Sequence, residues 1–161
     1  MRWALAFVLA VVPVAAGASH GQANPNFLER EIAGAHVGLT LSHLQTVLED
    51  EGFTFLRIQN VDKGLAAKGF DRPPYKLIFF GNRRQFERAR RIDPRVTPYL
   101  PLKVTVYQGP DGDTHLSVVD PAVVGRMFNP GLQNLFRKWS EAMTRILDRT
   151  VKRVEASTFS P

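Results

Sequence analysis

The sequence predicts an α+β domain, in which an antiparallel sheet carries helices on one face in the order β-α-β(4)-α. Two strand-forming stretches, 75–80 and 102–107, flank an arginine-rich segment. Polar turn formers at 109–113 join the second stretch to another alternating segment. Apolar residues spaced by three and four then run from Leu132 to Val151, as in a helix with one buried side. Strands joined by short links favour antiparallel pairing with helices on one face.

Composition is that of a globular protein, with 44% hydrophobic and 22% charged residues in a chain of 161. The chain has no cysteine, which excludes disulfides, thiolate metal sites and a cysteine nucleophile. The formal net charge of +6 favours anionic partners by long-range attraction, without identifying one.

Residues 1–23 are predicted to be a cleavable signal peptide. Arg2 supplies a positive start, and the apolar run from Ala4 to Ala16 is too short for a comfortable membrane span. The tripeptides at 16–18 and 21–23 both fit the small-x-small cleavage rule. We therefore expect a periplasmic or secreted protein with no transmembrane segment after cleavage. An uncleaved anchor or a buried N-terminal helix are the alternatives.

The remaining chain divides into a leader segment at 24–35, one α+β domain at 36–156 and a tail at 157–161. The leader mixes Asn, Pro, Glu, Arg and Gly. The domain is predicted to begin with a short strand at 36–41, where apolar residues alternate with others.

The first helix is predicted to begin at Ser42, because Ser42 and Gln45 fit a capping box. Gly52 should end it, since glycine adopts the left-handed conformation of a helix terminus at little cost. A strand at 53–59 and an irregular stretch at 60–72 follow.

The stretch 75–80 is apolar on both faces from Leu77 to Phe80, as in a central strand covered on both sides. The second cover could be a helix, a loop or a partner subunit. Gly81-Asn82 signals a turn, and Arg83 to Arg91 can form one short helix.

The last part of the chain contains two further helix starts. Asp120-Pro121 caps a short helix, and Asn129-Pro130 begins the final one, with Asn as the cap and Pro at the first helical position. This final helix should lie along one face of the sheet.

From Phe53 to Pro121 the chain resembles the bacterial family called domain of unknown function 302. The resemblance implies an antiparallel sheet of the TATA-box-binding-protein-like class and pairing of two copies, and it brings no assigned reaction. Many members place Asp-His where this chain has Gln59-Asn60, and Pro where it has Arg83. The pieces that carry the resemblance are Gly52-Phe53-Thr54, Pro73-Pro74, Leu77-Ile78-Phe79-Phe80-Gly81-Asn82, Asp93-Pro94, Leu100-Pro101-Leu102-Lys103, Val106-Tyr107 and Asp120-Pro121.

No catalytic residue, metal site or cofactor is predicted. His36, His43 and His115 fall on different elements, and neither a Gly-x-Ser-x-Gly nor a His-x-x-x-His motif is present. Asp111 and Asp113 lack the carboxylate count and distal Glu of a calcium loop, so they are interpreted as turn formers.

A ligand site is predicted where polar residues end the strands. Asn60, Gly81, Asn82 and Lys103 would converge on one pocket if their strands are neighbours. Alternatively, Gly81-Asn82 only turns the chain and Pro101-Leu102-Lys103 only sets strand register.

Arg84 and Arg88 lie in a cluster of six arginines between Arg83 and Arg95 and are further candidates for the ligand site. Guanidinium groups bind carboxylates, phosphates and sulfur oxyanions with two parallel hydrogen bonds. A solvated basic face, an anionic membrane surface or a cell-envelope polymer are the other interpretations.

The leading hypothesis is an exported binding domain, paired as a homodimer, for a small anionic or polar molecule. One alternative is a hydrolase or isomerase that uses Asp120 or Lys103 as acid or base. Another is a structural or adaptor protein that acts through dimerisation. Nucleic acid is not an expected partner of an exported protein.

Overall fold

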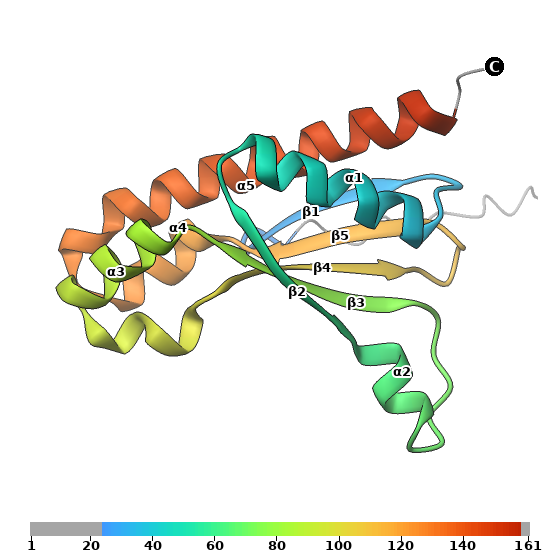
Figure 1. The fold of residues 1–161 in the computed structure, drawn as a ribbon, viewed down its shortest axis with the longest axis horizontal. Coiled ribbons are helices and arrows are strands. Elements are labelled where there is room, and N and C mark those ends of the chain that lie inside the picture. Colours follow the sequence, from blue (N-terminus) through green and yellow to red (C-terminus); the bar gives the residue numbers. More distant parts are fainter. Residues whose placement is uncertain (1–23, 159–161) are drawn as a thin grey trace, which may run out of the picture.

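The computed structural model describes residues 24–158, and the predicted signal peptide at 1–23 lies outside them. One antiparallel sheet has the strand order β1-β5-β4-β3-β2, which confirms the predicted α+β class (Figure 1). The element order β-α-β(4)-α is also confirmed, with short helices inserted between strands. The strands are β1 (Phe27–Ile32), β2 (Thr54–Asn60), β3 (Tyr75–Gly81), β4 (Leu102–Gln108) and β5 (Thr114–Val119).

Two long helices, α1 (Val37–Asp50) and α5 (Gln133–Thr158), lie side by side over one face of the sheet (Figure 1). The sheet turns Val104, Val106 and Leu116 toward them, and all three are fully buried. The shorter helices are α2 (Val61–Ala66), α3 (Arg83–Ile92) and α4 (Pro121–Val124), with 3₁₀ turns at Pro94–Tyr99, Gly125–Met127 and Pro130–Leu132.

The predicted stripe of the last helix is confirmed as its buried side. Phe136, Trp139, Ile146 and Leu147 are at most 1% exposed. Burying each such side chain contributes about 1.5–3 kcal/mol before the entropy cost is subtracted. The indole Nε1 of Trp139 donates to Gln85 Oε1 at 2.6 Å, which ties α5 to α3.

The predicted strand at 36–41 is wrong, because α1 begins at Val37. His36 is its N-cap, and the ring Nδ1 accepts a hydrogen bond from the Gly38 amide at 3.0 Å. Ser42 therefore lies within the helix and does not cap it. A short alternating run fits strand and helix equally well. The predicted end at Gly52 is confirmed, with φ of +79°.

The predicted leader contains the edge strand β1, which pairs with β5. Its inward side includes Ile32, which is 3% exposed, and Arg30, which binds Asp148 of α5 at 2.7 Å. The sequence conceals this strand, because residues 29–31 are all charged. The irregular stretch predicted at 60–72 likewise contains α2, a short helix at the end of β2.

The face of the sheet opposite α1 and α5 is largely open among residues 24–158 (Figure 1). Leu77 and Phe79 point to this side and are only half-buried, whereas Ile78 and Phe80 point to the helices and are buried. Helices therefore cover β3 on one side only, and the predicted second cover is not found within the described residues.

None of the helices between residues 24 and 158 combines the length and the apolar character needed to cross a membrane.

Candidate functional site

The strand pairing separates the residues predicted to form one pocket. Thr54 pairs with Gly81, whereas Asn60 pairs with Lys76 at the other end of the same two strands. Thr54 and Asn60 are the two ends of β2, six residue steps apart, which is a length of about 20 Å. Asn60 therefore does not share a rim with Gly81.

Asn82 holds two elements together. Its side-chain Oδ1 accepts a hydrogen bond from the Gln85 amide at 3.2 Å and caps α3. Its Nδ2 donates to the Gly52 carbonyl at 3.3 Å, which joins the start of α3 to the end of α1. This geometry supports the turn interpretation of Gly81-Asn82.

Lys103 lies at the same end of the sheet as Gly81, but on the open face. Its Nζ donates to the Tyr99 carbonyl at 3.4 Å and lies 5.7 Å from the centre of the Tyr99 ring. Asp120, the other residue of the enzyme hypothesis, accepts a hydrogen bond from the Ala122 amide at 2.9 Å and caps α4. Neither Lys103 nor Asp120 lines the cavity beside Gly81.

A cavity of about 690 Å³, here called the Gly81 cavity, opens where β2 begins and β3 ends, beside α3. Leu56 and Leu100 contribute apolar walls, and Arg83 and Arg90 contribute charge. The full lining is Thr54, Leu56, Gly81, Arg83, Phe86, Glu87, Arg90, Thr97, Leu100 and Pro101. Of the six residues predicted to bind a ligand, only Gly81 lines this cavity.

Glycine at position 81 lets α3 close one side of the Gly81 cavity. A Cβ atom there would lie 2.1 Å from Cζ of Phe86. The Phe86 ring can therefore rest directly on the backbone at the end of β3. Its edge meets Trp139 of α5, with 6.1 Å between ring centroids.

The charges at the Gly81 cavity lie on one face of α3, because Arg83, Glu87 and Arg90 are spaced by four and three. Arg83 Nε binds Glu87 Oε1 at 2.9 Å, and this hydrogen bond is the main cause that lowers the pKa of Glu87. Arg90 is exposed and its charge helps to lower the pKa of Glu87, but its side chain makes no hydrogen bond or ion pair with the residues that the structure describes. The predicted Arg84 and Arg88 do not line the cavity.

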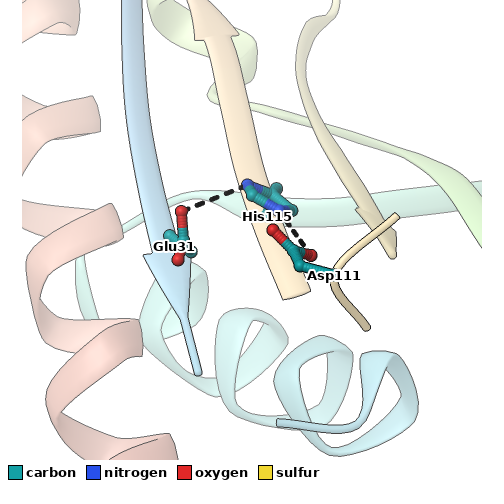
Figure 2. Close-up of side chains that lie close together, drawn as sticks. All are labelled: Glu31, Asp111 and His115. Atoms are coloured by element: carbon teal, nitrogen blue, oxygen red, sulfur yellow. Dashed lines mark ion pairs between the residues drawn. The ribbon is translucent and has the colours of Figure 1, made fainter. Parts of the chain in front are cut away.

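A second polar cluster lies at the other end of β4, where the hairpin of β4 and β5 meets β1 (Figure 2). It consists of Glu31 from β1, Asp111 from the hairpin loop and His115 from β5. Glu31 Oε2 lies 3.9 Å from His115 Nδ1, and Asp111 Oδ1 lies 3.5 Å from His115 Nε2. We call these three residues the His115 cluster.

The hairpin positions Asp111 through its own backbone. Asp111 Oδ1 accepts a hydrogen bond from the Asp113 amide at 3.0 Å. This bond is the main cause that lowers the pKa of Asp111, and the neighbouring His115 lowers it further. Asp111 is therefore the turn former that the sequence indicates, and its carboxylate also faces an imidazole ring.

Aromatic rings fix the orientation of His115. The ring stacks on Tyr107 with 5.1 Å between centroids and 15° between planes. Tyr107 in turn stacks on Tyr75 at 5.5 Å. The strand register places Tyr75, Tyr107, His115 and Glu31 in one row across four strands. The sequence does not reveal this row, because the charged residues of β1 conceal that strand.

Comparison with known proteins identifies relatives of uncharacterised function. The profile of the family described as "Domain of unknown function DUF302" matches residues 30–150. A crystal structure of an uncharacterised conserved DUF302 protein from Bacillus stearothermophilus is similar, with a TM-score of 0.72 and 26% sequence identity. That match covers 79% of this chain and 99% of the Bacillus chain. No curated protein shows significant similarity to the chain.

Proposed function

Because the chain belongs to the DUF302 family, whose description names no activity, we propose a function from its own residues: an exported domain that binds a small amphipathic anion. The observation that carries the proposal is Arg90, a cation without a hydrogen-bonding or ion-pair partner in residues 24–158, at the rim of an apolar cavity. The ligand would be an organic carboxylate or sulfonate with an aromatic or short aliphatic body.

The Gly81 cavity suits such a molecule in size and lining. Its volume of about 690 Å³ falls within the roughly 300–1,000 Å³ of small-molecule sites. Leu56, Phe86 and Leu100 would contact the apolar body of the ligand. Arg90 and Arg83 would bind the anionic group, since a guanidinium offers two parallel donors to an oxyanion.

The test is a thermal-shift screen of residues 24–161 with aromatic and aliphatic carboxylates and sulfonates, followed by calorimetry. A bound anion should raise the melting temperature. Arg90→Ala should weaken binding at least tenfold, because about 1.5–3 kcal/mol is typical of a charge-assisted hydrogen bond. Arg88→Ala is the matched control, since Arg88 lies on the same helix, is exposed and does not line the cavity.

Two results would contradict this function. If no anion of the panel raises the melting temperature, the Gly81 cavity is not a binding site. If Arg88→Ala and Arg90→Ala weaken binding equally, the attraction belongs to the net charge of α3 and not to the cavity.

Export is the second part of the proposal and rests on the sequence of residues 1–23. A chain tagged at its C-terminus should be found in the periplasm or medium. Its N-terminal residue, read by sequencing, should be residue 19 or residue 24. Full-length chain confined to the cytoplasm would remove this part of the proposal and leave the binding test unaffected.

Pairing of two copies through the open face of the sheet is a second candidate role. Leu77 and Phe79 are half-buried there, and no helix among residues 24–158 covers them. The two edges of this face carry opposite charges, with Glu29 and Glu31 on β1 and Arg57 on β2. A two-fold arrangement could set each acidic edge against the basic edge of the other copy.

Light scattering tests the pairing. The domain should have twice the mass of one chain, and Phe79→Lys should reduce it to one. Phe70→Lys is the control, because Phe70 is 63% exposed and lies outside the strands. A monomeric domain at high concentration would reject the pairing.

A further inference from the structure

We propose that the His115 cluster binds a divalent transition-metal ion of the Zn²⁺ type. One nitrogen of His115 and one carboxylate oxygen each from Glu31 and Asp111 all lie within 4.8 Å of one another (Figure 2). An imidazole with two carboxylates is a donor set that suits zinc and its neighbours, whereas calcium prefers oxygen donors alone. The site is distinct from the Gly81 cavity and does not depend on it.

His115 turns a buried nitrogen toward Asp111. Nε2 is buried and forms no hydrogen bond within the described part of the chain. Asp111 Oδ1 is close to it, at 3.5 Å. Two donors that bind one tetrahedral zinc at about 2.1 Å lie about 3.4 Å apart. The separation of these two atoms therefore fits a shared metal ion better than a hydrogen bond.

The ring of His115 is preorganised for binding. Stacking on Tyr107 fixes its plane, so binding a metal ion would cost little rotational freedom at this donor. Glu31 is the adjustable member of the cluster. Its Oε2 lies 3.9 Å from Nδ1, the other ring nitrogen, so it would have to rotate toward Nε2, and the 58% exposure of its side chain leaves room for this movement.

Charge in the His115 cluster favours a cation. Two carboxylates and a neutral imidazole give the cluster a formal charge of −2. Neither Glu31 nor Asp111 forms an ion pair with a Lys or Arg among residues 24–158. Arg30, the nearest cation in sequence to Glu31, is held by Asp148 at 2.7 Å. A divalent ion would neutralise the cluster.

Glycine at position 109 lets the hairpin backbone pass directly beside the donor atoms of His115 and Asp111. A Cβ atom at this position would lie 2.4 Å from His115 Nε2 and 2.6 Å from Asp111 Oδ1. A cavity of about 210 Å³ adjoins the cluster, and its lining includes Glu31, Tyr107 and His115. Water molecules could complete the coordination from this side, as expected of a site with three protein donors.

The test is titration of untagged residues 24–161 with Zn²⁺ by calorimetry, with bound metal counted after dialysis. One ion per chain is expected. His115→Ala and Asp111→Asn should each weaken binding at least tenfold. His43→Ala is the matched control, because His43 is a half-buried histidine whose Nε2 lies 2.9 Å from Ser157 Oγ, outside the cluster.

Gly109→Ala is an independent variant that retains all three donors. It should weaken Zn²⁺ binding by displacing His115 and Asp111, and circular dichroism should show the fold unchanged. Substitution by Co²⁺ gives a second readout, since a four-coordinate site should produce visible absorption that His115→Ala abolishes. Binding that is absent, or that is equal in the wild type, His115→Ala and Gly109→Ala, would overturn the proposal.

Discussion

Replacing Gly125 by Ala should destabilise the domain, because this glycine lies against the last helix. A Cβ atom at position 125 would lie 2.6 Å from Cβ and 2.7 Å from Cγ of Phe136, which is fully buried. Carbon atoms in contact normally lie about 3.5–4.0 Å apart, so α5 would have to shift by about 1 Å. Side-chain rotation cannot relieve the overlap, because Cβ is fixed to the backbone.

The expected magnitude combines two opposing effects. Overpacking of a tight core typically costs about 1–3 kcal/mol. Gly→Ala at a residue with negative φ, such as Gly125 at −57°, restores about 0.4–1 kcal/mol by restricting the unfolded chain. The net loss should be about 1–2 kcal/mol, which lowers the melting temperature by about 3–6 °C for a chain of this length.

Gly64→Ala is the matched control and should have the opposite sign. Gly64 lies in α2, and a Cβ atom there would meet nothing within 4 Å. Alanine in place of glycine inside a helix stabilises by about 0.5–1 kcal/mol at most. Urea unfolding followed by the fluorescence of Trp139, whose ring centroid is 4.9 Å from that of Phe136, measures both variants.

Unfolding of Gly125→Ala at the same urea concentration as the wild type, or at a higher one, would contradict this prediction. Close packing of the 125–127 turn against α5 would then be incorrect. If Gly64→Ala lowers the free energy of unfolding as much as Gly125→Ala does, the loss in Gly125→Ala does not come from contact with Phe136.

Three further predictions concern stability. Leu147→Ala should cost about 2–5 kcal/mol in urea unfolding, because Leu147 is fully buried; a loss under about 1 kcal/mol would show that the site collapses around the gap. Hydrogen bonds from Arg95 chiefly lower the pKa of Asp93, so its contribution to stability is complete near neutral pH and is lost progressively from about pH 5 downward. Asp93→Asn should therefore be less stable than the wild type at pH 7, and its free energy of unfolding should fall less as the pH is lowered below about 5. If the free energies of the two proteins fall in parallel with pH, the prediction is wrong. The pKa of Glu51 is also lowered, chiefly by its hydrogen bond with Arg149, so ionised Glu51 stabilises the fold in the same way. Glu51→Gln should therefore be less stable than the wild type at pH 7, and the stabilities of the two proteins should become equal in acid.

The sequence predicts those elements of the fold whose periodicity is long. The buried side of α5 extends over several turns, and only a helix explains it. The strands at 75–80 and 102–107 are long enough to be unambiguous and are confirmed within one residue. The run at 36–41 is too short to separate strand from helix, and tertiary contacts with the sheet decide it.

The candidate sites are harder to predict, because they depend on which side chains a fold brings together. One signal for the Gly81 cavity was available on α3. Phe86 and Ala89 mark the side of this helix that packs inward, and Arg83 and Arg90 flank Phe86 at spacings of three and four. Membership of the arginine cluster instead predicts Arg84 and Arg88, because it takes no account of which side of the helix is apolar.

The His115 cluster could not be predicted, because it depends on the register between β1 and β5. Glu31 pairs with His115 across these strands. A slip of one residue would place Ile32 on the open face and Glu31 in the core. Burial of Ile32 therefore fixes the register, and the register in turn places the carboxylate of Glu31 beside the imidazole.

The two candidate sites lie at opposite ends of β4, and this arrangement decides what each can do. β4 begins at Leu102 beside the Gly81 cavity and ends at Gln108, next to the hairpin of the His115 cluster. Its seven residues span about 20 Å, which is too far for one small ligand to reach both sites. A metal ion at His115 would therefore contact β1 and the β4–β5 hairpin, whereas an anion at Arg90 would contact α3. Zn²⁺ should leave the affinity for an anion unchanged, and a change of more than about threefold would require the sheet to couple its two ends.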